Sequence, residues 1–110
     1  MLRGPMREPT YLTLTSLLDG ALHGYAIIKR VEELSHGRVR LAAGTLYAAL
    51  DRLSDEGLVE VRSEETVNGR ARRYYGLTGA GRAALRAEAT RMAQAARLVT
   101  DRQARVVKPA

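Results

Sequence analysis

Three arginines and two tyrosines follow an Asn-Gly pair in the segment VNGRARRYYGLT, residues 67–78. Arg70, Arg72 and Arg73 concentrate more positive charge than a solvated loop needs and more than a core strand tolerates. Charge of this kind suits a polyanion such as the phosphate backbone of a nucleic acid. What these side chains do depends on the elements that position them.

The overall charge points in the same direction. The 110 residues carry a formal net charge of +6 and a sequence pI of about 10.3, so we expect a polyanionic partner. A biased genomic base composition also yields an arginine-rich chain, and Lys29 and Lys108 are the only lysines. The positions of the arginines therefore carry more weight than their number.

Composition also excludes several classes of protein. Hydrophobic residues make up 45% and charged residues 27% of the chain, which fits one globular domain. The absence of cysteine excludes disulfides and thiolate zinc sites. No apolar run approaches the roughly 18 residues of a membrane span, and the first ten residues contain no signal-peptide core. We expect a cytoplasmic protein with no membrane partner.

Helical periodicity predicts three helices in the first half of the chain. The first is opened by Pro9, and its apolar stripe consists of Leu14, Leu17, Leu18 and Ala21. The second spans about residues 25–35, and its apolar face consists of Ile27, Ile28, Val31 and Leu34. The third spans about residues 44–56, and its core face consists of Leu46, Ala49, Leu50 and Leu53.

The outward face of the third helix begins with small residues, so this helix can approach a partner closely. At about 100° per residue, the residues that point away from the core are Gly44, Ala48 and Asp51. Thr45 and Arg52 flank this face on one side, and Tyr47 flanks it on the other.

The periodicity then changes from helix to strand. Residues 58–62, LVEVR, alternate valine with charged residues, which predicts a half-buried strand with Val59 and Val61 on one side. Residues 72–77, RRYYGL, form the matching return strand, with a turn over residues 63–70 that contains Asn-Gly. Since side chains alternate across a strand, at most one of Tyr74 and Tyr75 is expected in the core.

A last helix is predicted over residues 79–104, with Thr78 as its N-cap. Its apolar residues step by four, three, four and three, which is typical of a heptad seam, and they are Leu85, Ala89, Met92, Ala96 and Val99. This seam either packs back on its own domain or meets a partner subunit. We favour the partner, because the seam continues past the reach of a small core. Residues 105–110 are expected to fray.

Three helices followed by a basic hairpin predict a winged helix-turn-helix: a mostly α fold with a small β-hairpin and a C-terminal dimerisation helix. A major groove about 12 Å wide accepts one α-helix, and a hairpin beside it can reach phosphates or the minor groove. In this arrangement the helix at residues 44–56 reads bases, and a wing at residues 62–75 binds the backbone or the minor groove. The candidate DNA-binding residues are Thr45, Tyr47, Ala48, Arg52, Arg70, Arg72 and Arg73.

Three motifs, HGYAIIKRVEE, GTLYAALDRLSDEGLVE and GRARRYYGLTGAGRAAL, resemble the PadR family of winged-helix transcriptional regulators. The resemblance covers roughly residues 10–90. The chain looks most like the smaller branch of the family, whose members have one short C-terminal helix. It implies a homodimer that binds pseudo-palindromic double-stranded promoter DNA and usually represses. The implied organisation is a flexible leader at 1–9, a DNA-binding domain at 10–78 and a dimerisation helix at 79–104.

The chain departs from the family pattern at several positions. Ala42 and Ala43 replace a Ser-Pro pair that is frequent before the third helix, which removes a cap worth about 1 kcal/mol. Prolines frequent in the family are replaced by Ala48 and Ala71. The chain also has no tryptophan and no phenylalanine, so it cannot build the aromatic drug-binding sandwich of some small members. A small-molecule effector is compatible with the resemblance but is not predicted.

Several of these residues have simpler interpretations. Tyr47 can pack between helices, and Arg52 can pair with Glu56 on its own helix. His23 and His36 are the only histidines, and a lone histidine is more often structural than a metal ligand or base. We find no phosphate-cradling loop and no nucleophile with a base, so we expect no enzymatic activity, cofactor or metal. Two other functions remain open: a nonspecific architectural DNA binder and a protein-interaction adaptor.

Overall fold

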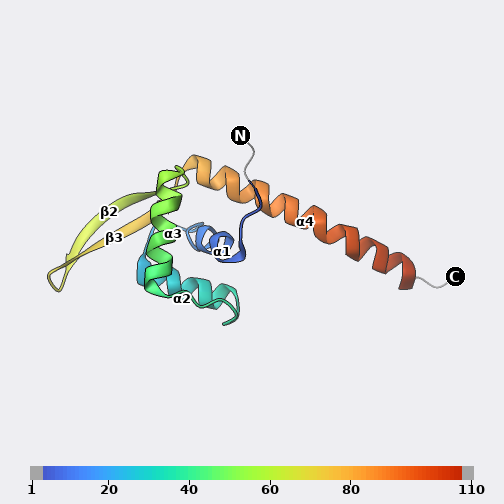
Figure 1. Cartoon of the computed structure of the whole chain (residues 1–110), viewed down its shortest axis with the longest axis horizontal. Coiled ribbons are helices and arrows are strands. Elements are labelled where there is room, and N and C mark those ends of the chain that lie inside the picture. The colour runs from blue at the N-terminus through green and yellow to red at the C-terminus, as the bar shows by residue number, and fades with distance from the viewer. Residues whose placement is uncertain (1–3, 108–110) are drawn as a thin grey trace.

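Three short helices pack around an apolar centre, as the helical spacing predicts (Figure 1). The computed structural model describes residues 4–107, and the helices are α1 (Glu8–Ser16), α2 (Gly24–Leu34) and α3 (Ala43–Asp55). Most of the predicted apolar stripes are confirmed in the core. The fully buried members from these helices and the residue that follows α1 are Leu14, Leu17, Ile27, Val31, Leu46, Leu50 and Leu53.

The first helix ends earlier than its stripe suggests. Leu17 and Leu18 donate backbone hydrogen bonds to residues three positions back, at 3.1 Å each, which closes the last turn tightly. Leu18 therefore leaves the apolar stripe and is 43% exposed, so its prediction as a core residue is wrong.

The predicted leader at residues 1–9 is partly folded into the body. α1 begins at Glu8, and Pro9 occupies its first turn as expected. Met6 packs against the core, and its backbone N–H donates to the Glu88 carboxylate at 3.1 Å. The predicted boundary at residue 9 is therefore wrong, since contacts with the body begin at Met6. Residues 1–3 lie outside the described part of the chain.

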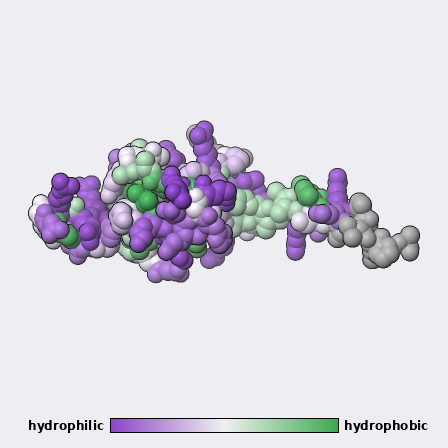
Figure 2. Space-filling model, turned by 90° about the horizontal axis from the view of Figure 1, so that it is seen from below, coloured by the Kyte–Doolittle hydropathy of each residue, from purple (hydrophilic) through white to green (hydrophobic). Residues whose placement is uncertain are grey.

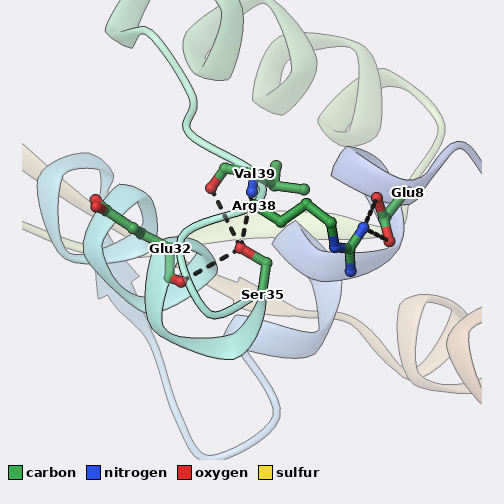
Figure 3. A network of polar contacts seen from close by, with 5 residues as sticks. All are labelled: Glu8, Glu32, Ser35, Arg38 and Val39. Atoms are coloured by element: carbon green, nitrogen blue, oxygen red, sulfur yellow. Dashed lines mark hydrogen bonds and ion pairs between the residues drawn. The ribbon is translucent and has the colours of Figure 1, made fainter.

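A polar network holds the turn between α2 and α3 (Figure 3). The Ser35 hydroxyl donates to the Glu32 carbonyl at 3.2 Å and accepts the Val39 N–H at 2.9 Å. Arg38 in the same turn makes a bidentate contact with Glu8 of α1, with Nη1 at 2.6 and 2.5 Å from the two carboxylate oxygens. These contacts connect α1, the end of α2 and the segment that leads to α3.

The hairpin is longer than predicted, and its turn is shorter. β2 (Val59–Val67) and β3 (Arg70–Leu77) are joined by only Asn68 and Gly69, whose φ values are 52° and 76°. Positive φ at both positions is what a two-residue hairpin turn requires. The expected turn over residues 63–70 is therefore wrong, because its polar residues pair across the strands instead of forming a loop.

A third strand, β1 (Leu22–His23), completes an antiparallel sheet of order β1-β3-β2. Two residues are too few to show a period, so the sequence does not predict it. β1 pairs with the middle of β3, placing Leu22 opposite Tyr75 and His23 opposite Tyr74. Tyr75 is buried and Tyr74 only partly so, as strand alternation predicts.

The register of the hairpin shifts at Arg62, the extra residue between the paired Val61 and Ser63. Arg62 folds over Gly76, where a Cβ would come within 2.9 Å of the arginine, and donates to the Leu77 carbonyl. Val59 is buried, but Val61 is 47% exposed, so the predicted burial of Val61 is wrong.

The last helix, α4 (Gly79–Val107), runs away from the body (Figure 1). Thr78 caps it as predicted, because its hydroxyl accepts the Gly81 N–H at 2.9 Å. The helix continues to Val107, beyond the predicted boundary at residue 104, and residues 108–110 lie outside the described chain. No helix within residues 4–107 is both long enough and apolar enough to cross a membrane.

Candidate nucleic-acid interface

The exposed side of α3 is built from small residues, as its spacing predicts. Gly44, Thr45 and Ala48 are exposed, while Leu46 and Leu50 hold the opposite side in the core. Ala42 stands at the N-cap without a side-chain hydrogen bond, which confirms the loss of a cap at this end. The buried contacts of Leu46 and Leu50 therefore hold α3 in place, and its outer surface is exposed to solvent.

A groove of about 800 Å³ separates α3 from the wing, which we define as β2, β3 and their turn. Helices contribute one wall and strands the other, so the groove joins segments distant in sequence. The residues that line it are His23, Gly24, Tyr25, Tyr47, Asp51, Val67, Asn68, Arg70, Ala71, Arg72, Arg73 and Tyr75. The strongly polar wing extends to one side of the body in Figure 2.

Tyr47 lies directly on Gly24, the first residue of α2. A Cβ at Gly24 would come within 2.4 Å of the Tyr47 hydroxyl oxygen, so only glycine permits this approach. Tyr47 is nevertheless 47% exposed. The packing interpretation of Tyr47 is present in the structure, because the hydroxyl end of its ring lies against the start of α2, and the residue also lines the groove.

Cross-strand glutamates accompany two of the three wing arginines. Glu64 lies opposite Arg73 and Glu65 opposite Arg72, with N to O distances of 3.2 and 3.8 Å. Hydrogen bonding to Glu64, and secondly to Tyr75, raises the pKa of Arg73. Arg70, beside the turn, makes no ion pair within residues 4–107 and is exposed. The wing is thus less strongly basic than its arginines alone suggest, and its charge is concentrated at the tip.

His23 joins the start of α2 to the wing. Its Nδ1 accepts the Ala26 N–H at 3.4 Å as an N-cap, and its ring meets Tyr74 edge-on with centroids 5.4 Å apart. Burial, and secondly the positive charge of Arg72, lower the pKa of His23, while Glu65 acts in the opposite direction. The neutral imidazole is therefore the form that holds this junction.

The groove contains four of the seven candidate DNA-binding residues: Tyr47, Arg70, Arg72 and Arg73. Thr45 and Ala48 lie exposed on α3 outside its lining. Arg52 faces a separate hollow beside α1, where Nη2 donates to the Thr10 hydroxyl at 3.3 Å and Nη1 lies 3.7 Å from Glu56. The simpler interpretation of Arg52, a pair with Glu56, is present in the structure.

The groove also contains residues that the sequence did not single out for DNA. Tyr25 is 67% exposed at the start of α2. An exposed tyrosine leaves no periodic signal in the sequence, because periodicity indicates the buried face of a helix. Asp51 also lines the groove and makes no ion pair among the described residues.

The predicted seam of α4 divides between two environments. Leu85 is 5% exposed and belongs to the core of its own domain, which favours the alternative interpretation at this position. Ala89 and Met92 are partly buried. Ala96 is exposed, and Val99 is 66% exposed, beyond the reach of the body. Figure 2 shows apolar surface continuing along this part of α4.

Comparison with known proteins identifies the family and the fold. The family model described as the transcriptional regulator PadR-like family matches residues 13–87. The chain belongs to this family. It is 41% identical to the transcriptional regulator Rv3488 of Mycobacterium tuberculosis over 85 residues, which span 77% of this chain and 76% of that protein. The PadR resemblance of the three sequence motifs is thereby confirmed.

Solved PadR structures share the architecture. A PadR family transcription regulator from Clostridium difficile superposes with a TM-score of 0.73 at 25% identity, over 86% of this chain and 97% of that one. Bacillus subtilis PadR in complex with operator DNA superposes with a TM-score of 0.65 at 28% identity, over 73% of this chain and 46% of that one. The predicted winged-helix fold is confirmed. In this PadR-like chain, α3 is the third helix of that fold and directly precedes the wing.

No metal centre is evident in the part of the chain that the structure describes. Within residues 4–107, no three histidine, cysteine, aspartate or glutamate side chains gather as they do around a metal ion. Every buried side-chain nitrogen and oxygen of these residues has a hydrogen-bond partner. The PadR-like family consists of transcriptional regulators, a class that is generally not enzymatic.

Proposed function

We propose that this PadR-like protein is a sequence-specific DNA-binding regulator, a homodimeric repressor at a pseudo-palindromic promoter site. The groove between α3 and the wing, with three arginines in its lining, carries the proposal. Bacillus subtilis PadR, which shares the fold, was solved with operator DNA.

In the proposed complex, α3 enters the major groove along its face of small residues. Gly44 and Ala48 let the helix backbone come close, and Thr45 is placed to contact a base edge or a thymine methyl. The wing then lies against the adjacent backbone or minor groove, where Arg70, Arg72 and Arg73 meet phosphates. Arg52 lies at the edge of α3 away from the groove, beside Thr10 and Glu56, and there it would contact a phosphate.

The homodimer is supported by the exposed part of α4. A helix that leaves its body with Val99 66% exposed has an apolar face to cover. Alanine-rich seams allow two helices to pack closely, so a second copy of α4 fits Ala89, Met92, Ala96 and Val99. Two recognition helices about 34 Å apart then read two half-sites of one operator.

We assign the proposed activity to the cytoplasm, as the compartment in which the protein would reach promoter DNA. The proposed activity of the groove is DNA binding alone, so the proposal includes no catalytic step.

The test is fluorescence anisotropy with the protein's own upstream DNA and a scrambled duplex, each at two salt concentrations. Specific binding predicts a preference for the upstream DNA that survives at the higher salt. Equal binding to both duplexes that collapses with salt would favour a nonspecific architectural binder. No binding at either salt would favour a protein-interaction adaptor on the same scaffold.

A further inference from the structure

One carboxylate on the recognition helix has no partner, although it shares a groove with arginines. Asp51 lines the groove together with Arg70, Arg72 and Arg73. Those arginines pair instead with glutamates of β2 or with none. No ion pair or hydrogen bond involves the Asp51 carboxylate within residues 4–107. The fold therefore presents this carboxylate unneutralised to whatever fills the groove.

Asp51 lies on the side of α3 that comes closest to DNA in the proposed complex. Gly44, Ala48 and Asp51 are four and three residues apart, so they lie on one face of the helix. Gly44 and Ala48 carry almost no side chain, and nothing lies within 4 Å of the Cβ position of Gly44. Asp51 is thus the first residue along this face with a longer, charged side chain.

A carboxylate at this position costs affinity for phosphates and must be offset by hydrogen-bond donors. In the major groove, cytosine presents its N4 amino group as a donor, which aspartate accepts. Guanine and thymine present acceptor oxygens there, which repel a carboxylate. A negative charge in the groove therefore selects among bases, and the wing arginines supply the general attraction that tolerates it.

We propose that Asp51 reads the N4 amino group of a cytosine in each operator half-site and so determines part of the sequence specificity. The inference rests on the proposed function, since it requires α3 to lie in a major groove. To the proposed function it adds the identity of the base that the Asp51 side chain recognises.

The experiment selects duplexes from a randomised pool with the full chain and with Asp51→Asn and Asp51→Ala. The natural protein is expected to prefer cytosine at one position of each half-site by about tenfold or more, the range of one good base contact. Asp51→Asn should shift that position alone toward adenine, because asparagine pairs with adenine N6 and N7. Asp51→Ala should lose the preference and bind scrambled DNA more tightly.

Asp55→Asn is the matched control. Asp55 is exposed on the same helix and its substitution changes the charge equally, but it does not line the groove. The control should select the same site as the natural protein. An unchanged site with Asp51→Asn and Asp51→Ala would overturn the role of Asp51 and leave the proposed function standing. A natural protein that selects no site would overturn both.

Discussion

Glu64 lies directly opposite Arg73 in the wing, and its carboxylate accepts a hydrogen bond of 3.2 Å from the arginine Nε. The neighbouring pair of Arg72 and Glu65 is looser, at 3.8 Å. Both pairs are exposed, so each adds little to stability. An incoming phosphate can therefore take the place of either carboxylate at little cost.

Removing a wing arginine should weaken binding to every DNA sequence alike. Arg70→Ala, Arg72→Ala and Arg73→Ala should each reduce the slope of log affinity against log salt by about 1. Arg70→Ala should lose the most affinity, because no carboxylate competes for Arg70 within the described chain. Anisotropy over a salt series measures both quantities, with Arg97→Ala on α4 as the control. If all three variants keep the natural affinity and salt slope, the wing is not part of the DNA interface.

Neutralising the competing glutamate should have the opposite effect. Glu64→Gln frees Arg73 and removes a negative charge near the phosphates, so affinity for all DNA should rise by up to about fivefold at low salt. Glu33→Gln is a matched control, because Glu33 also pairs with an exposed arginine, Arg30 at 3.6 Å, but lies outside the groove. Weaker binding by Glu64→Gln would show that Glu64 holds Arg73 in its binding position.

A charge in the predicted seam of α4 should separate the proposed dimer. Met92→Asp places a carboxylate among apolar residues that a second copy would cover, and sedimentation velocity should then show a monomer. Thr90→Asp adds the same charge on the opposite side of α4, about 200° away, and should remain dimeric. A dimeric Met92→Asp variant would exclude this seam as the contact.

Gly81 has no room for a side chain, although it lies in a helix. A Cβ there would come within 2.0 Å of the Leu58 carbonyl oxygen, a backbone atom that cannot turn away. Gly81→Ala should therefore destabilise the fold by about 1–3 kcal/mol, as overpacking does. Gly79→Ala meets nothing within 4 Å and should be neutral or slightly stabilising. Thermal unfolding of both variants makes the comparison, and equal midpoints would contradict it.

Stability should fall with acid in a way that depends on His23. Its pKa is lowered in the fold, chiefly by burial, so the unfolded chain binds this proton more tightly. The contribution of His23 is therefore complete above the unfolded pKa of about 6.5 and is lost as the pH falls toward the folded value. His23→Asn keeps a capping side chain and should flatten the dependence of the melting temperature on pH between about 7.5 and 5.5. His36→Asn, the control, should retain it.

Local pattern was sufficient for most of the framework. Helical spacing identified α1 to α3 and their buried leucines, and Asn68 and Gly69 marked the turn because few residues accept positive φ. Thr78 was recognisable as a cap because a capping hydroxyl acts within one turn of its own helix. The order of these elements was enough to predict a winged helix.

Longer-range pairing could not be predicted in this way. The polar residues at 63–66 resemble a loop, yet they form strand, because they pair with residues 71–74 of β3. β1 exists only because β3 is beside it. Burial of Leu85 in its own core likewise depends on the angle at which α4 leaves the body.

By itself the sequence determined the element order, the buried stripes and the basic character of one hairpin, because these follow from spacing and side-chain type along the chain. Only the tertiary structure decided that Tyr25, Asp51 and the wing arginines share one groove while Arg52 faces α1. The physical reason is that a groove is formed by the packing of α2, α3 and the wing against one another. Those contacts join residues far apart in the chain, where no period can indicate them.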